Sequence, residues 1–139
     1  MAALLTSGAC VGSSRGDADY RKKAVATTEH VRSSVRTVQL AVQAASDDDA
    51  FGPFLSRVIS QAEDDASSAL NGFGSVQPPS ARSDQLRAAV EHAASDAIDV
   101  LTQARIAARR SDREALSMLA DRLVRLGDQL EQFAKDHHA

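Results

Sequence analysis

Glutamate and histidine bind metals in helical proteins, but here they occur at spacings that do not let both bind one metal ion. Glu29 is adjacent to His30, and Glu91 is adjacent to His92. Side chains of adjacent residues diverge by about 100° around a helix. A di-metal site in a four-helix bundle needs Glu and His three residues apart. We therefore expect no metal and no cofactor, with both histidines at or near the surface.

Three consecutive carboxylates, Asp47 to Asp49, are the next candidate for chemistry. A calcium loop needs ligands at alternate positions, a central glycine and a distant glutamate, and this stretch has none of these. Pro53 fits the first turn of a helix. The sequence thus predicts that the carboxylates cap that helix and compensate its dipole.

Motifs for catalysis are absent from the sequence. It has no glycine-rich phosphate loop and no nucleophile elbow. A single cysteine excludes an internal disulfide and a haem attachment of the Cys-x-x-Cys-His type. These absences predict a protein that is not an enzyme.

Cys10, the one cysteine, follows Leu4-Leu5 and the small residues Ser7-Gly8-Ala9. This stretch resembles the end of a bacterial lipoprotein signal peptide, in which the cysteine is acylated and becomes the mature N-terminus. The resemblance implies an exported protein held at the extracytoplasmic face of the cell membrane. Residues 1–16 are then a signal remnant and a flexible tether, and we expect an in-frame basic and apolar extension upstream.

Basic residues cluster just after this segment, at Arg15, Arg21, Lys22 and Lys23. Near a membrane each would favour anionic headgroups by about 1 kcal/mol. The alternative is a plain frayed N-terminus in which Cys10 has no role, and a cytoplasmic protein.

The densest basic surface is predicted further along the chain. Arg105, Arg109 and Arg113 recur every four residues, and Arg110 lies beside them. Such stripes are commonly solvated or paired, here with nearby carboxylates or an acidic second helix. The alternative is an interaction surface for an acidic protein or lipid headgroups. Nucleic acid is not expected, because the net charge is −3 and no aromatic residues are interleaved with the basic ones.

Alanine-rich helices must position these residues. The chain has 139 residues, 26 alanines, no tryptophan and 4% aromatic residues, which favours an all-α fold. The most regular apolar stripe alternates by three and four residues, as one face of a helix does. Its members are Leu116, Leu119, Leu123, Leu126, Leu130 and Phe133.

The full pattern predicts an antiparallel up-down four-helix bundle as a single domain over residues 17–136. Helices are expected near 18–46, 53–71, 81–110 and 112–135. Asn71-Gly72 should end the second helix, and Ser111 should cap the fourth after a turn between Ala108 and Ala115. The alanines of the third helix should then face the leucines of the fourth. We expect a monomer rather than a homodimer.

Three functions remain open from the sequence. The first is a lipid-tethered interaction or structural module with an unknown protein partner. The second is a cytosolic coiled-coil adaptor that self-associates or binds a partner helix, and the third is a small-ligand carrier.

Overall fold

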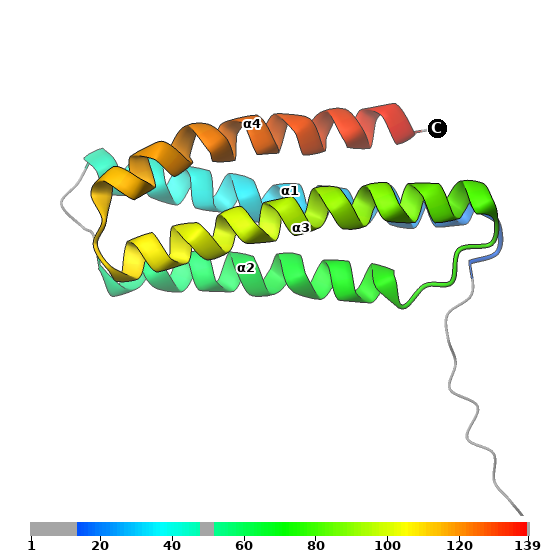
Figure 1. The fold of residues 1–139 in the computed structure, drawn as a ribbon, viewed down its shortest axis with the longest axis horizontal. Coiled ribbons are helices and arrows are strands. Elements are labelled where there is room, and N and C mark those ends of the chain that lie inside the picture. Colours follow the sequence, from blue (N-terminus) through cyan, green and yellow to red (C-terminus); the bar gives the residue numbers. More distant parts are fainter. Residues whose placement is uncertain (1–13, 48–51, 139) are drawn as a thin grey trace, which may run out of the picture.

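Four helices contain nearly all residues that the computed structural model describes, which are 14–47 and 52–138. They are α1 (Asp17–Asp47), α2 (Pro53–Gly74), α3 (Ala81–Arg109) and α4 (Arg113–His137). Successive helices run in opposite directions (Figure 1), so the predicted all-α, antiparallel up-down bundle is confirmed. Cys10, Asp48 and Asp49 lie outside the described residues.

Helices α1 and α3 form the centre of the bundle. Each packs against all three other helices, whereas α2 and α4, both described over their full lengths, do not pack against each other. The inner faces of α1 and α3 carry mostly valine and alanine, and small side chains let helix axes approach closely. Within the described part of the chain, no helix is long and apolar enough to cross a membrane.

Apolar stripes of α1 and α4 form much of the core, which confirms the stripe predicted for α4. The α1 stripe is buried at every position: Tyr20, Ala24, Thr28, Val31, Val35, Val38, Val42 and Ala45. The five leucines of the α4 stripe are buried as well, and Phe133 at its end is half-buried. Because both stripes are continuous, they fix the facing sides of these two helices over most of their length.

The predicted pairing of α3 alanines with α4 leucines is only part of the packing. Helix α4 packs more extensively on α1 than on α3. Two ion pairs accompany the valine stripe of α1, with Arg32 3.1 Å from Glu131 and Arg36 2.6 Å from Asp128. Opposite charges therefore face each other between α1 and α4.

Helix α2 is longer than predicted, and the predicted end of this helix at Asn71-Gly72 is wrong. The helix continues to Gly74, and Ser75 occupies the C-cap position. Phe73 is buried, with its ring centre 5.1 Å from that of Tyr20. Only a further helical turn carries Phe73 into this contact, and burying a ring of that size outweighs the weak tendency of Gly72 to end a helix.

The caps of the helices differ from prediction in two places. The turn between α3 and α4 is where it was predicted, but Asp112 rather than Ser111 caps α4 by accepting the backbone N–H of Ala115 at 3.0 Å. The N-cap residue of α2 is Gly52, which offers no side chain, rather than an aspartate. Ser80 caps α3 by accepting the backbone N–H of Ser83.

Candidate interaction site

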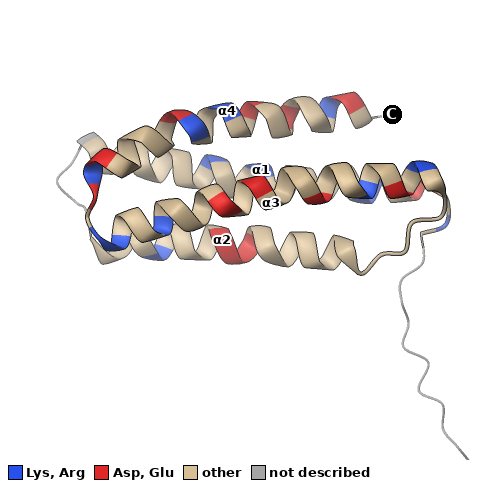
Figure 2. Ribbon diagram, in the orientation of Figure 1, with Lys and Arg blue, Asp and Glu red and all other residues tan. Residues whose placement is uncertain are grey.

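Charged groups span α1–α4 and α2–α3, two of the five pairs of helices that pack together in the described part of the chain. Between α1 and α4 the ion pairs of Arg32 and Arg36 span the seam. Between α2 and α3, Glu63 accepts hydrogen bonds from the Thr102 hydroxyl, at 2.7 Å, and from the Arg105 guanidinium. Charged residues of both signs also occur along all four helices (Figure 2). The α1–α2 and α3–α4 seams each contain a hollow.

Glu63 is held by two side chains of α3. Burial raises its pKa, but the hydrogen bonds from Arg105 and Thr102 and the positive charges of Arg105 and Arg109 together lower it by more. The pKa of Glu63 therefore lies below its usual value. Glu63 remains ionised at neutral pH and holds Arg105 against α2.

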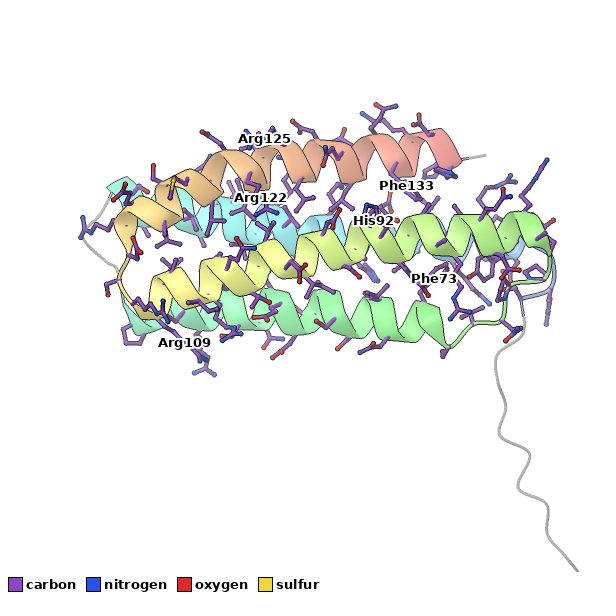
Figure 3. The ribbon with its side chains drawn as sticks, viewed as in Figure 1. Phe73, His92, Arg109, Arg122, Arg125 and Phe133 are labelled. Carbon is purple, nitrogen blue, oxygen red and sulfur yellow. The ribbon has the colours of Figure 1, made fainter. Side chains whose placement is uncertain are left out.

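The predicted arginine surface does not form one stripe. Arg105 is paired with Glu63 on the α2 side of the bundle. Arg109 lies toward α2 as well (Figure 3), and its charge lowers the pKa of Glu63. Arg110 faces the opposite seam and lines a hollow between α3 and α4. Arg113 belongs to α4, because the turn at 110–112 interrupts the four-residue repeat. The prediction that arginines pair with the acidic second helix is confirmed for Arg105.

A groove runs along the seam between α3 and α4. Its larger part has a volume of about 410 Å³ and lies near the α3–α4 turn. A smaller part of about 320 Å³ continues along the same helices and shares Arg122 with it. We call the two together the α3–α4 groove. Its main lining residues are Val100, Ile106, Arg110, Met118, Arg122 and Arg125.

The α3–α4 groove combines an apolar floor with basic rims. Met118 is 67% exposed and Ile106 39% exposed, although both are large and apolar. Arg122 lies between α4 and α3 (Figure 3) and donates a hydrogen bond to the neutral side chain of Gln103 at 3.3 Å. In the described residues, no ion pair is found for Arg110, Arg122 or Arg125.

Two carboxylates line the groove beside its three arginines. Asp112 accepts the N–H of Ala115 as the cap of α4. Asp96 lies 3.5 Å from the imidazole of His92, which forms an ion pair with it only when protonated. The lining therefore has more cationic than anionic side chains, which suits an anionic, partly apolar ligand.

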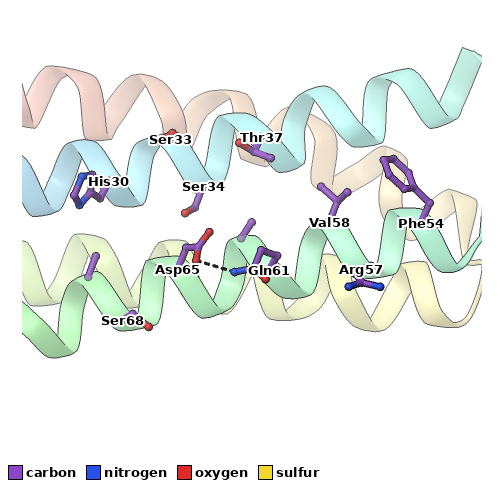
Figure 4. Close-up of a pocket in the computed structure, with 12 residues that line it drawn as sticks. His30, Ser33, Ser34, Thr37, Phe54, Arg57, Val58, Gln61, Asp65 and Ser68 are labelled. Atoms are coloured by element: carbon purple, nitrogen blue, oxygen red, sulfur yellow. Dashed lines mark hydrogen bonds between the residues drawn. The ribbon is translucent and has the colours of Figure 1, made fainter.

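The α1–α2 seam holds a larger but chemically different hollow of about 820 Å³ (Figure 4). Hydroxyl groups line much of it, from Ser33, Ser34, Thr37 and Ser68. A 2.9 Å hydrogen bond between Gln61 and Asp65 occupies one wall. Its charged residues, Arg57 and Asp65, are of opposite sign, so this wide hollow has no excess of one charge that would favour an ionic ligand.

The end of the bundle where α1 begins is held by hydrogen bonds. Asp17 accepts from the hydroxyls of Ser80, at 2.6 Å, and Ser83, at 2.7 Å, so that the starts of α1 and α3 are joined. These two hydrogen bonds lower the pKa of Asp17. The predicted basic cluster nearby is partly neutralised, because Lys23 lies 3.2 Å from Asp19.

Metal binding finds no support in the described part of the chain. His30 and His92 are exposed, as predicted. No group of three or more histidine, cysteine, aspartate and glutamate side chains that could hold a metal ion is found in residues 14–47 and 52–138. Cys10, the predicted lipid attachment site, lies outside those residues.

Comparison of the chain with known protein families, curated proteins and solved structures gives no match. The site must therefore be judged from its own chemistry. Sequence reasoning included Arg110 in its candidate surface but missed Ile106, Met118, Arg122 and Arg125. The available signal was that Ile106 and Met118 are large apolar residues outside the apolar stripes and close to the same predicted turn.

Proposed function

We propose that this chain is a non-enzymatic interaction module, tethered to a membrane through Cys10, that binds a protein partner in the α3–α4 groove. One observation carries the proposal: the exposed large apolar residues gather at one end of the bundle. They are Leu40 (64% exposed), Phe54 (76%), Ile106 and Met118. In an up-down bundle the late parts of α1 and α3 and the early parts of α2 and α4 share that end.

The position of the chain's N-terminal part supports the tether. Helix α1 begins at the opposite end of the bundle, at Asp17. A lipid on Cys10 would therefore hold the bundle by the end at which no large apolar side chain is exposed among residues 14–47 and 52–138. The α3–α4 turn and the larger part of the groove would point away from the membrane, toward a partner.

Fractionation of cells tests the tether. The full chain, expressed with its natural upstream sequence in a bacterium, should enter the membrane fraction and take up a labelled fatty acid. Cys10→Ala should abolish both. An unlabelled, soluble wild-type protein, or a labelled Cys10→Ala variant, would rule out the tether and leave docking in the groove as a separate question.

Docking is tested by a photo-crosslinking amino acid at Met118 in the producing cell. A matched control carries it at Ala88, an exposed position on α3 near the other end of the bundle. We expect a discrete adduct with one protein from Met118 and none from Ala88. Adducts of equal yield from both positions, or from neither, would contradict docking in the groove.

A self-associating coiled-coil adaptor is less well supported. Pairing between chains through a leucine seam needs that seam to be exposed. Leu123 and Leu130 of α4 are instead buried within the chain. A small-ligand carrier would need an enclosed apolar cavity, and both large hollows are open grooves along seams.

A further inference from the structure

We infer that the occupant of the α3–α4 groove is an acidic amphipathic helix of a partner protein. The inference rests on the proposed docking function and names the chemistry of the partner. It follows from the length, the apolar floor and the unpaired charges of the groove.

The length of the groove suits a short helix. Its lining residues on α3 extend from Asp96 to Arg110. At a rise of about 1.5 Å per residue this is about 20 Å, the length of a helix of about 14 residues. A helix laid along the seam would contact α3 and α4 together, as a fifth helix added to the bundle.

The floor of the groove suits side chains repeated every three or four residues. Ile106 and Met118 provide large apolar contacts from the two sides, and Ala107 and Ala115 leave room between them. Methionine adapts its shape to different partners because it is unbranched and flexible. Burying the exposed parts of Met118 and Ile106 would supply the apolar share of the affinity.

The rims decide the sign of the partner's charge. Arg110 is the C-cap residue of α3, at the α3–α4 turn, and Arg122 and Arg125 belong to α4, so cations lie at one end of the floor and along its α4 side. The hydrogen bond from Arg122 to Gln103 is exposed and involves a neutral acceptor, so a carboxylate can replace it at little cost. An occupant with glutamates on both sides of its apolar face would pair with all three arginines.

A direct binding measurement tests the inference. The probe is a labelled, helix-stabilised 16-residue peptide with leucine on one face and glutamate elsewhere, and its control carries lysine in place of every glutamate. The full chain has only two methionines, Met1 and Met118. Methyl-¹³C methionine labelling therefore reports contact at the groove through the single signal of Met118.

We expect the glutamate peptide to bind, to shift the Met118 methyl signal and to lose affinity as salt is raised. Arg122→Glu and Arg125→Glu together should weaken binding by at least about tenfold, because like charges would then face each other. Arg57→Glu is the matched control, since Arg57 is an exposed arginine in the α1–α2 seam. It should leave affinity within about twofold, well below the tenfold that 1.4 kcal/mol represents.

Several results would overturn the inference. The first is tighter binding of the lysine peptide than of the glutamate peptide, and the second is an equal loss of peptide affinity in the Arg57→Glu variant. The third is a shift of the Met118 methyl signal when the chain dimerises without peptide. The fourth is a shift of that signal by phosphatidylglycerol vesicles but not by the peptide. If the Met118 crosslinker captures a protein in cells but the glutamate peptide does not bind, docking stands and only the acidic helix is wrong.

Discussion

The guanidinium group of Arg36 on α1 lies directly over Gly127 on α4. A Cβ atom added to Gly127 would lie 2.8 Å from both Cζ and Nε of Arg36. From this position Arg36 reaches Asp128 at 2.6 Å and Gln39 at 2.8 Å. The glycine thus gives the arginine room to cross the seam between the two helices.

We predict that the effect of Gly127→Ala depends on Arg36. In a helix interior, alanine is favoured over glycine by about 1 kcal/mol. In the wild-type background this gain is offset by displacement of Arg36, whose exposed ion pair contributes at most about 1 kcal/mol. Gly127→Ala should therefore be nearly neutral in wild type and stabilising by about 1 kcal/mol in Arg36→Ala.

Denaturant unfolding of the four proteins of this double-mutant cycle measures the coupling. The same free-energy change for Gly127→Ala in both backgrounds would show that Arg36 does not occupy the space over the glycine.

The sequence predicts those features of the fold that depend on residues close together in the chain. The stripes of α1 and α4 follow from spacing within one helix, and so did the turn near Asp112. The extension of α2 through Phe73 depends on its contact with Tyr20, which is more than fifty residues away in sequence. No local pattern reports such a contact.

The candidate site was predicted less well. Arg110 was grouped with the four-residue repeat of arginines that begins at Arg105, although Arg105 and Arg110 are about 140° apart around a helix and face different seams. The exposure of Ile106 and Met118 depends on the position of α4 relative to α1 and α3. The packing of α4 mainly on α1 leaves the α3 side open.

Truncation of the α4 core stripe should be costly. Leu123 is fully buried midway along α4, so Leu123→Ala should lower the free energy of unfolding by about 2 to 5 kcal/mol. Gln129→Ala, at an exposed position on the same helix, is the control and should change it by less than about 0.5 kcal/mol. Denaturant titration of both variants measures the difference, and equal losses would contradict burial of the stripe.

Removing the hydroxyl of Tyr20 should stabilise the protein, whereas truncating Leu123 should destabilise it. It is buried and has no hydrogen-bond partner in the described part of the protein, and burial raises the pKa of the phenol. Leaving a buried polar group unsatisfied costs about 1 to 3 kcal/mol. Tyr20→Phe removes that group while keeping the ring against Phe73, and should stabilise the fold by about 1 kcal/mol.

Tyr20→Leu provides the control, since it removes the ring contact with Phe73 as well and should destabilise the protein. A loss of stability in Tyr20→Phe would mean that the hydroxyl makes a hydrogen bond in solution.

Acid should weaken the bundle partly through Glu63. Its pKa is lower in the folded protein than the usual unfolded value, so its ionised form stabilises the fold above about pH 4.3. This contribution is lost as the pH falls through the folded pKa. Glu63→Gln should lower stability at pH 7 and reduce the further loss between pH 5 and pH 3, measured by denaturant unfolding at each pH.

Asp99→Asn is the control for Glu63, because Asp99 is an exposed carboxylate on α3 and should leave the slope nearly unchanged. A pH slope in Glu63→Gln as steep as in wild type would assign the acid sensitivity to other carboxylates, such as Asp17 and Glu131, whose pKa values are also lowered.

The turn between α3 and α4 gives two substitutions with opposite expected signs at adjacent residues. Ser111 has a φ of 53°, in the left-handed region, which costs a residue with a Cβ about 1 to 2 kcal/mol. Ser111→Gly relieves this cost but gives the unfolded chain more freedom, so a net gain of about 0.5 to 1 kcal/mol is expected. Asp112→Ala instead removes the hydrogen bond that caps α4 at Ala115 and should cost about 0.5 to 2 kcal/mol.

If α3 and α4 formed one straight helix in solution, the signs would change: Ser111→Gly would destabilise the protein and Asp112→Ala would stabilise it, because alanine is the better helix former and glycine the worse. Denaturant unfolding of the two variants therefore distinguishes the turn from a continuous helix.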